Sequence, residues 1–197
     1  MEKITNYRLQ DFLLLEDYQL VSDYMDILDL LMPVKSIADP INIGFPSIKI
    51  KPVMSLTFGQ VLEIRNYLNS RDIEAVCLVV GLVTGLINDE VFLLPILDFY
   101  GIISSVKCDI IQMANMEANE LENEDNDPIM FEVNAGERLA RFGALNPINS
   151  LAGDDITKWD AIQKLPYTTV FTKLKMDKER AAINKDIQAI QKRKQQQ

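Results

Sequence analysis

The sequence Ser-Leu-Ala-Gly-Asp-Asp-Ile-Thr-Lys-Trp-Asp-Ala-Ile-Gln-Lys-Leu-Pro-Tyr-Thr-Thr-Val-Phe-Thr-Lys-Leu, residues 150–174, carries the densest set of local structural signals in the chain. Gly153 permits a tight turn, and Thr157 is placed to cap a short helix with Asp160 three residues later. Pro166 ends that helix or begins the next one, because proline lacks the backbone N–H that a helix interior requires. These signals predict two helical elements joined at a fixed angle.

Large aromatic side chains lie on both sides of this predicted bend. Trp159 is the only tryptophan of the chain, and Tyr167 and Phe171 follow Pro166. Rings of this size dominate the packing energy of cores and interfaces. We therefore predict that these four residues form a packing hinge that holds the terminal helix against the body of the protein. They do not form a catalytic set, so this stretch indicates association rather than chemistry.

From Tyr167 the pattern predicts one long helix that projects at the C-terminus. Its first part is apolar, and Ile183, Ile187 and Ile190 continue an apolar stripe at four- and three-residue spacing. The distal half is too polar to be buried alone, so we predict that it docks on another protein or on the acidic Glu117–Asp127 segment of a neighbouring copy. A frayed tail that only adds solubility fits the same residues equally well. The candidate interaction residues are Trp159, Tyr167, Phe171, Ile183, Ile187, Ile190, Lys192, Arg193 and Lys194.

Composition and charge limit the classes of partner. The chain has 197 residues, 48% of them hydrophobic, which suits one domain or one domain with an extension. Its net charge is -9, whereas residues 173–197 hold eight bases and three acids, a local +5 that leaves -14 for the remainder. The negative body should repel phosphate, and the tail lacks the aromatic residues that stack on single strands. We therefore expect no specific nucleic-acid partner, with a nucleic-acid-binding protein that uses the basic tail as a lower alternative.

Two features bear on localisation. The N-terminal Met-Glu-Lys-Ile-Thr-Asn-Tyr lacks the pattern of a secretory signal, which predicts a cytosolic protein. The apolar run Ala75–Ile87 is shorter than the roughly 20 residues of a membrane-spanning helix. Gly81 and Gly85 form the G-x-x-x-G pair typical of membrane helices, but a buried core helix needs the same small residues. We therefore favour a core helix over a membrane hairpin and expect no membrane partner.

Upstream of the opening stretch, apolar spacing predicts several further elements. A helix is expected over residues 17–32, with Leu20, Tyr24, Ile27, Leu28 and Leu31 on its apolar face. Period-two alternation in Ile41–Ile43 and Ile48–Ile50 predicts a small β-hairpin or ribbon near residues 41–51, with Lys49 and Lys51 toward solvent. Thr57 and Gln60 predict the start of a helix that runs to about Asn69, and Asp72 can cap its successor.

The middle of the chain is read in the same way. Asn88, Asp89 and Glu90 fit the cap and first turn of a helix that runs through or restarts at Pro95 and continues to about Leu121. Glu117–Asp127 holds six acids and no base, which predicts a solvated loop and the best domain boundary. A short helix is then expected over Phe131–Phe142, with Leu139 and Phe142 inward, followed by a turn at Asn146-Pro147.

Residues that carry chemistry are scarce. The chain has no histidine, which excludes Ser-His and Cys-His nucleophiles and the usual zinc sites. Cys77 and Cys108 lie in apolar surroundings, so both are expected to be buried. No phosphate-binding loop occurs. An acidic ridge of Asp23, Asp26 and Asp29 raises a metal-site alternative, but such a ridge is usually a solvated helix face. We predict no catalytic residue, cofactor or metal, with an enzyme built from Asp, Glu, Lys and Tyr as a lower alternative.

Four motifs resemble those of small morphogenesis proteins from tailed bacteriophages, in particular tail-assembly chaperone-like proteins. They are Leu56-Thr-Phe-Gly-Gln, Ala135-Gly-Glu, Leu151-Ala-Gly-Asp-Asp-Ile and Leu165-Pro-Tyr-Thr-Thr-Val-Phe, followed by a charged terminal helix. The resemblance covers about residues 53–190. It implies a non-enzymatic helical protein that binds other phage structural or assembly proteins, with a homo-oligomer as a further partner, in the host cytoplasm. The alternative is a permanent virion component such as a head-tail connector or ring protein.

These inferences combine into one fold prediction. We expect a mainly α protein with a small β-hairpin or ribbon near residues 41–51 and a long projecting C-terminal helix. Along the sequence we distinguish an N-terminal helix and Pro-rich ribbon (1–55), a helical core with an acidic loop (56–127), a Trp/Pro/Tyr packing segment (128–175) and a basic helical tail (176–197).

Overall fold

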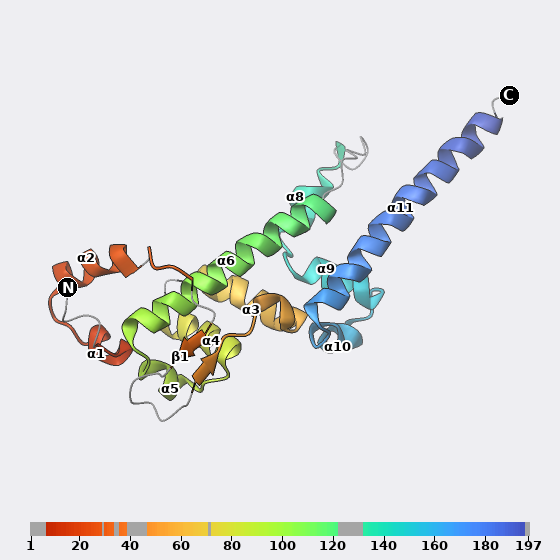
Figure 1. Ribbon diagram of the computed structural model, residues 1–197. Helices are drawn as coiled ribbons and strands as arrows, with labels where there is room; N and C mark the ends of the chain where they lie inside the picture. The colour runs from red at the N-terminus through yellow and green to blue at the C-terminus, as the bar shows by residue number, and fades with distance from the viewer. Residues whose placement is uncertain are drawn as a thin grey trace. The chain divides into compact units, whose positions relative to one another are not determined.

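The computed structural model describes residues 7–28, 30–33, 36–38, 47–70, 72–121 and 132–195. The predicted mainly α fold, with a long C-terminal helix, is confirmed (Figure 1). The chain forms two compact units, and each is described by itself. Unit 1 comprises Met1–Leu56 and Gln60–Met113, and unit 2 comprises Thr57–Gly59 and Ala114–Gln197.

Unit 1 contains short N-terminal helices, a two-stranded ribbon and most of two long helices. Its elements are α1 (Leu9–Leu13), α2 (Tyr18–Leu28), β1 (Ser36–Ala38), β2 (Ser47–Lys49), the 3-10 turn η2 (Val53–Ser55), α4 (Ile73–Thr84) and α5 (Asn88–Phe92). Helix α3 (Phe58–Leu68) starts in unit 2 and continues in unit 1, and α6 (Ile96–Leu121) belongs to unit 1 as far as Met113. The remaining elements of unit 2 are α8 (Ala135–Ala140), α9 (Leu145–Ala152), η3 (Ile156–Lys158), α10 (Trp159–Gln163) and α11 (Tyr167–Gln195).

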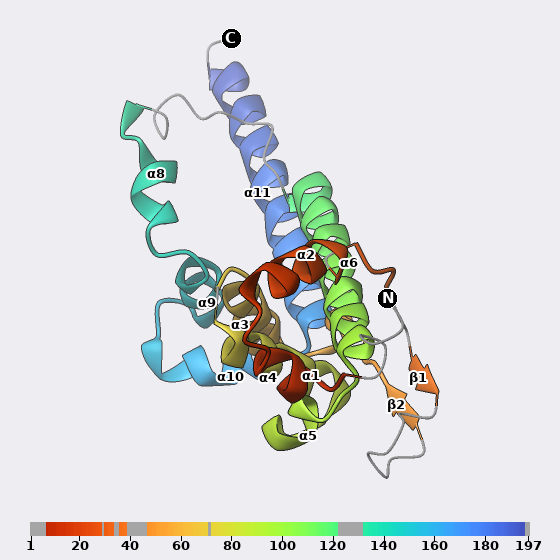
Figure 2. The same ribbon diagram turned by 90° about the vertical axis from the view of Figure 1, so that its left-hand side faces the viewer.

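The predicted ribbon is present, but its first strand differs from the expected one. Strands β1 and β2 pair antiparallel, with Ile37 opposite Ile48, and both views show them side by side (Figure 2). Residues 41–43, the predicted first strand, lie outside the described residues. Ile48 is buried while Lys49 and Lys51 are exposed, as the period-two alternation predicts.

Helix α4 supplies much of the core of unit 1. Asp72 caps it as predicted, since its Oδ1 accepts a hydrogen bond of 3.0 Å from the Glu74 N–H. The helix ends at Gly85, which has a φ of +84° that favours glycine. A Cβ on Gly81 would lie 2.9 Å from the Leu86 carbonyl oxygen, so a larger residue at this position would clash with the chain where it turns after the helix. The predicted core helix is confirmed, and no helix in the described ranges is long and apolar enough to cross a membrane.

Backbone hydrogen bonds hold α1 to the start of α6. The Leu9 N–H donates to the Leu94 carbonyl at 2.9 Å, and the Ile96 N–H donates to the Tyr7 carbonyl at 2.9 Å. Arg8 and Pro95 thereby form an antiparallel bridge. The long helix restarts after Pro95 and ends at Leu121, as the sequence predicts. Leu9, Leu94 and Ile96 are fully buried, so apolar packing reinforces this junction.

The predictions for the N-terminal part of the chain are partly wrong. Helix α2 ends at Leu28 rather than near residue 32, and Leu20 and Ile27 on its predicted inner face are exposed. Cys108 is exposed, although Cys77 is buried as expected. The errors in burial have one cause. A single helix periodicity identifies an apolar face but not how much of it a neighbour covers.

The predictions for residues 117–152 need similar corrections. Glu117 to Leu121 belong to α6 rather than to a loop, and residues 122–131 lie outside the described part. Leu139 and Phe142 are exposed, not inward. Pro147 lies within the first turn of α9, where its missing N–H costs nothing, so no turn forms there.

Candidate protein-docking helix

Helix α11 begins at a junction built from two distant segments of unit 2. The Phe58 N–H donates to the Leu165 carbonyl at 2.8 Å, and Thr57 and Pro166 form an antiparallel bridge. A Cβ on Gly59 would lie 3.1 Å from Gln163 Cβ, so a larger residue would crowd this contact. Two of the motifs quoted from the sequence therefore meet in space, and together they set where α11 starts.

An aromatic cluster lies at the first two turns of α11. The Tyr167 ring is stacked on that of Phe171, with centroids 6.1 Å apart and an interplanar angle of 13°, and it lies 6.5 Å from the Phe58 ring. Tyr167 is almost fully buried, and its hydroxyl donates a 2.5 Å hydrogen bond to Glu117 Oε1. Val170 on the next turn is also buried. The cluster combines apolar burial with a charge-assisted hydrogen bond, so it anchors the helix.

Charged contacts between the end of α6 and α11 extend this anchor. Lys175 Nζ lies 2.6 Å from Glu120 Oε2, and Lys178 Nζ donates to the Glu120 backbone carbonyl at 3.1 Å. The hydrogen bond from Lys175 lowers the pKa of Glu120, and the charges of Lys175 and Lys178 act in the same direction. These pairs are solvent-exposed, so they orient the helix more than they stabilise it.

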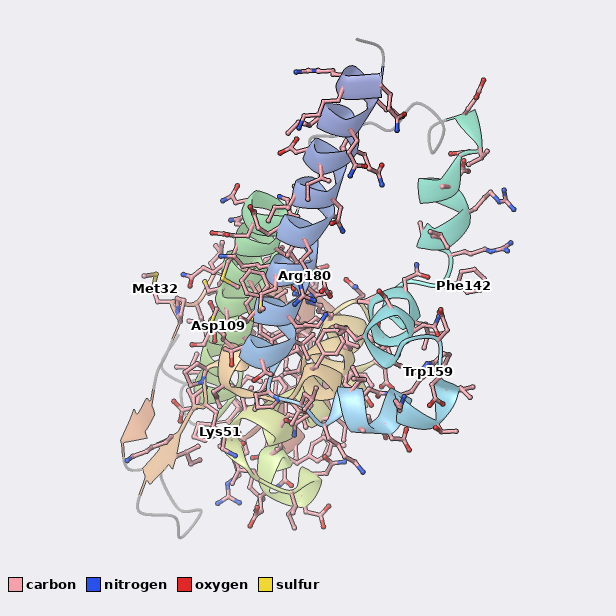
Figure 3. All side chains as sticks on the ribbon, turned by 90° about the vertical axis from the view of Figure 1, so that its right-hand side faces the viewer. Met32, Lys51, Asp109, Phe142, Trp159 and Arg180 are labelled. Atoms are coloured by element: carbon pink, nitrogen blue, oxygen red, sulfur yellow. The ribbon has the colours of Figure 1, made fainter. Side chains whose placement is uncertain are left out.

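Beyond the anchor, the side chains of α11 are no longer buried. Every side chain from Glu179 to Gln195 is exposed, including Ile183 (48%), Ile187 (47%) and Ile190 (52%). Side chains beyond Arg180 point outward around the whole helix (Figure 3). Lys192, Arg193 and Lys194 lie in its last turn. The predicted isoleucine stripe is thus presented on an exposed helical arm, which we call the distal arm (residues 179–195).

The predicted role of Trp159 in the hinge changes. Trp159 starts α10, is only half-buried, and donates from Nε1 to Asn149 Oδ1 at 3.3 Å, so its hydrogen bond reaches α9 rather than α11.

The turn and cap residues of this stretch are confirmed in part. The helical cap is Asp155, whose Oδ1 accepts from the Thr157 N–H at 3.0 Å, rather than Thr157 itself. Gly153 ends α9 with a φ of +64°, and α11 starts directly after Pro166, as predicted. Of the named aromatic residues, Tyr167 and Phe171 come together, and Phe58 is the partner that the sequence analysis missed.

Few polar groups converge at this site. The groups that converge at the anchor are aromatic rings, one phenol hydroxyl and two carboxylates, and both carboxylates already accept hydrogen bonds. Within the described ranges, no three Asp, Glu, Cys or His side chains form a cluster that could hold a metal ion. Comparisons with protein-family models, with characterised proteins and with solved structures find no match to this chain.

Proposed function

We propose that this chain is a non-enzymatic assembly protein of a tailed bacteriophage, and that its distal arm is the element that binds the partner. The motifs at residues 56–60 and 165–171 resemble those of tail-assembly chaperone-like proteins, and these are the segments that build the start of α11. We therefore assign a chaperone-like role, in which the arm holds another phage structural or assembly protein in the host cytoplasm during tail assembly.

The observation that carries the proposal is the contrast within one helix. The proximal part of α11 is held by buried Tyr167 and Val170 and by Glu120, whereas the distal arm exposes three isoleucines in register. An exposed helix gains little stability from its own hydrogen bonds in water. An amphipathic helix with anchors at these spacings fits a groove in another protein, and partner binding would then order it.

The proposal is tested with a chain that ends at Arg180, which keeps the anchor and removes the arm. We expect the shortened protein to fold with unchanged circular dichroism per helical residue and unchanged Trp159 fluorescence. In a phage that carries this variant, we expect the yield of tailed particles to fall. A finer variant is Ile187→Asp, matched by Gln188→Asp, which adds the same charge off the stripe.

Two results decide the test. Particle yield should fall for the shortened chain and for Ile187→Asp but not for Gln188→Asp, and normal yield from the shortened chain would overturn the proposal. Mass spectrometry of purified particles then separates the two phage roles. A chaperone is absent from finished particles, whereas a connector or ring protein is present in fixed copy number.

A further inference from the structure

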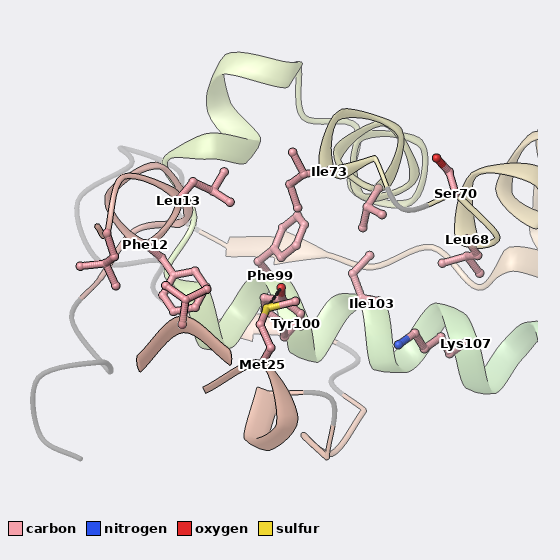
Figure 4. A pocket seen from close by; sticks show the side chains of 13 residues that line it. Phe12, Leu13, Met25, Leu68, Ser70, Ile73, Phe99, Tyr100, Ile103 and Lys107 are labelled. Atoms are coloured by element: carbon pink, nitrogen blue, oxygen red, sulfur yellow. Dashed lines mark hydrogen bonds between the residues drawn. The ribbon is translucent and has the colours of Figure 1, made fainter. Parts of the chain in front are cut away.

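Unit 1 contains a cavity with a volume of about 600 Å³. Its walls come from five helices, with Phe12 and Leu13 on α1, Met25 on α2, Leu68 on α3, Ile73 on α4, and Phe99 and Ile103 on α6 (Figure 4). The Tyr100 hydroxyl donates to Met25 Sδ at 2.8 Å across one side. A cavity of this size and apolar lining is large enough to receive several side chains from a partner.

Apolar surface continues from this cavity to the outside of α1 and α2. Leu13 and Met25 line the cavity and are also exposed, by 44% and 36%. Leu14, Leu20 and Ile27 add further exposed apolar side chains on the same two helices and their connection. Together these residues form the α1–α2 surface. Exposed apolar patches that lead into a cavity mark interaction sites more often than isolated exposed residues do.

The charged side chains of α1, α2 and their connection have one sign, and one base, Lys107 of α6, lines the cavity itself. From Leu9 to Leu28 the chain carries five acids and no base, and all five carboxylates are exposed. They are Asp11, Glu16, Asp17, Asp23 and Asp26. A partner that covers the apolar residues therefore gains from basic side chains at its edges.

The chain itself supplies a surface with the complementary properties. From Ala181 to Gln195 the distal arm has four bases and one acid, beside its stripe of Ile183, Ile187 and Ile190. At 1.5 Å per residue, the stripe spans roughly 10 Å, and α2 spans roughly 16 Å, so the stripe fits within the length of α2. We propose that the distal arm of one copy docks on the α1–α2 surface of a second copy and inserts isoleucine side chains at the mouth of the cavity.

This pairing deepens the proposed function, on which it rests, because it names a second copy as a partner of the arm. Unit 1 already shows a related contact. Met25 of α2 accepts a hydrogen bond from Tyr100 of α6, and Ser104 Oγ donates to the Leu31 carbonyl at 2.7 Å just beyond α2. The acidic amphipathic helix α2 thus packs on α6, which, like α11, is a long helix that starts after a Leu-Pro pair.

The experiment measures the mass of the full chain by sedimentation equilibrium over a wide range of concentration. We expect the wild-type protein to self-associate, and Ile187→Asp to weaken self-association roughly tenfold or more, while the matched Gln188→Asp does not. Charge reversal supplies a test that misfolding cannot imitate. Asp23→Lys with Asp26→Lys, and separately Lys192→Glu with Arg193→Glu, should each weaken association, and the four changes combined in one chain should restore it.

A mixing experiment completes the test. An equimolar mixture of the Asp23→Lys, Asp26→Lys protein with the Lys192→Glu, Arg193→Glu protein pairs reversed surface with reversed arm, so it should form a mixed complex. A wild-type chain that stays monomeric throughout, or charge-reversed proteins that associate as the wild type does, would overturn the inference. The proposed function fails separately, through normal particle yield without the arm. If the wild-type chain is monomeric but the shortened chain still lowers the yield of tailed particles, only the second copy is rejected as the partner of the arm.

Discussion

Helices α6 and α11 start in the same way and end differently. Each follows a Leu-Pro pair, Leu94-Pro95 or Leu165-Pro166, and each is preceded by a five-residue helix, α5 or α10. In each junction an upstream segment bridges the proline, and its next N–H donates to the leucine carbonyl, at 2.9 Å from Leu9 and 2.8 Å from Phe58. The helix before each five-residue helix, α4 or α9, ends at a glycine with positive φ, Gly85 or Gly153. One local design thus occurs once in each unit.

The two helices differ in what covers them after the junction. Helix α6 continues with Ile102, Ile103 and Val106, all buried, whereas the residues at the same distance from Pro166 are Lys173, Leu174 and Asp177, none of them buried. The junction sets the start of a helix in both units. The residues that follow decide whether the helix is buried by other parts of the chain or stays exposed.

The chain contains a natural reporter for each unit. Trp159 lies in unit 2, and Cys77 is a buried thiol of unit 1. Burial, followed by the charges of Glu74 and Asp72, raises the pKa of Cys77 to about 11, so the thiol stays protonated and unreactive until unit 1 opens. In a Cys108→Ser background, thiol labelling reports on unit 1 and tryptophan fluorescence reports on unit 2.

The largest effect on stability is expected in α6, just after the junction in unit 1. Phe99 is fully buried in α6, and Phe99→Ala should lower the free energy of unfolding of unit 1 by about 3–5 kcal/mol because it empties an aromatic site. Denaturant titration followed by Cys77 labelling measures it. If the midpoint measured by Trp159 fluorescence shifts as far as the midpoint measured by thiol labelling, the two units do not unfold independently.

The anchor of α11 should respond somewhat less. We expect Tyr167→Ala to cost about 3 kcal/mol in unit 2 and Tyr167→Phe about 1 kcal/mol, since the latter removes only the hydrogen bond to Glu117. Trp159 fluorescence against denaturant gives both values. Equal costs for the two variants would show that the hydroxyl rather than the ring holds the helix.

A matched pair of alanine substitutions compares the two bridges. Gly59 and Gln10 occupy the same position relative to the bridging residues Thr57 and Arg8. Gly59→Ala should destabilise unit 2 by about 1–3 kcal/mol because its Cβ meets Gln163, whereas Gln10→Ala should change unit 1 by less than about 0.5 kcal/mol. Thermal unfolding with the two reporters compares them, and a neutral Gly59→Ala would mean that α10 yields to the added methyl group.

The ion pair at Glu120 makes the anchor weakly sensitive to acid. Its pKa is lowered in the folded protein, so its contribution is present above the ordinary glutamate pKa of about 4.3 and is lost as the pH falls through the lowered value. Lys175→Gln should flatten this part of the pH profile and leave neutral-pH stability almost unchanged, because the pair is exposed. If the stability of Lys175→Gln falls at low pH as it does in the wild type, the acid sensitivity comes from other carboxylates.

The smallest effect on stability is expected in the distal arm. Ile187→Asp should change the free energy of unfolding of unit 2 by less than about 0.5 kcal/mol, since Ile187 is exposed. Hydrogen exchange should be fast from Ala182 onward and slow at Phe171 and Leu174. Slow exchange throughout the arm in dilute protein would contradict an uncovered helix.

Local signals predicted where most helices begin and end. The Asp72 cap, the restart after Pro95, the end near Leu121 and the start after Pro166 are confirmed. Predictions of burial did less well, because Leu139, Phe142 and Cys108 lie on apolar faces that no described neighbour covers. For the candidate site, the sequence indicated Tyr167, Phe171 and the isoleucine stripe but not Phe58 or Glu117.

Features encoded within one or two helical turns could be predicted from the amino-acid sequence alone. A glycine with positive φ, an aspartate cap or a proline acts through neighbouring backbone atoms, so residues 150–174 show their turns without reference to the rest of the chain. The pairing of Thr57–Gly59 with Leu165–Tyr167, and the hydrogen bond of Trp159 to Asn149 rather than to α11, are seen only in the folded chain. Such contacts depend on burial between segments far apart in the chain, and the periodicity of one helix does not specify which segment provides it.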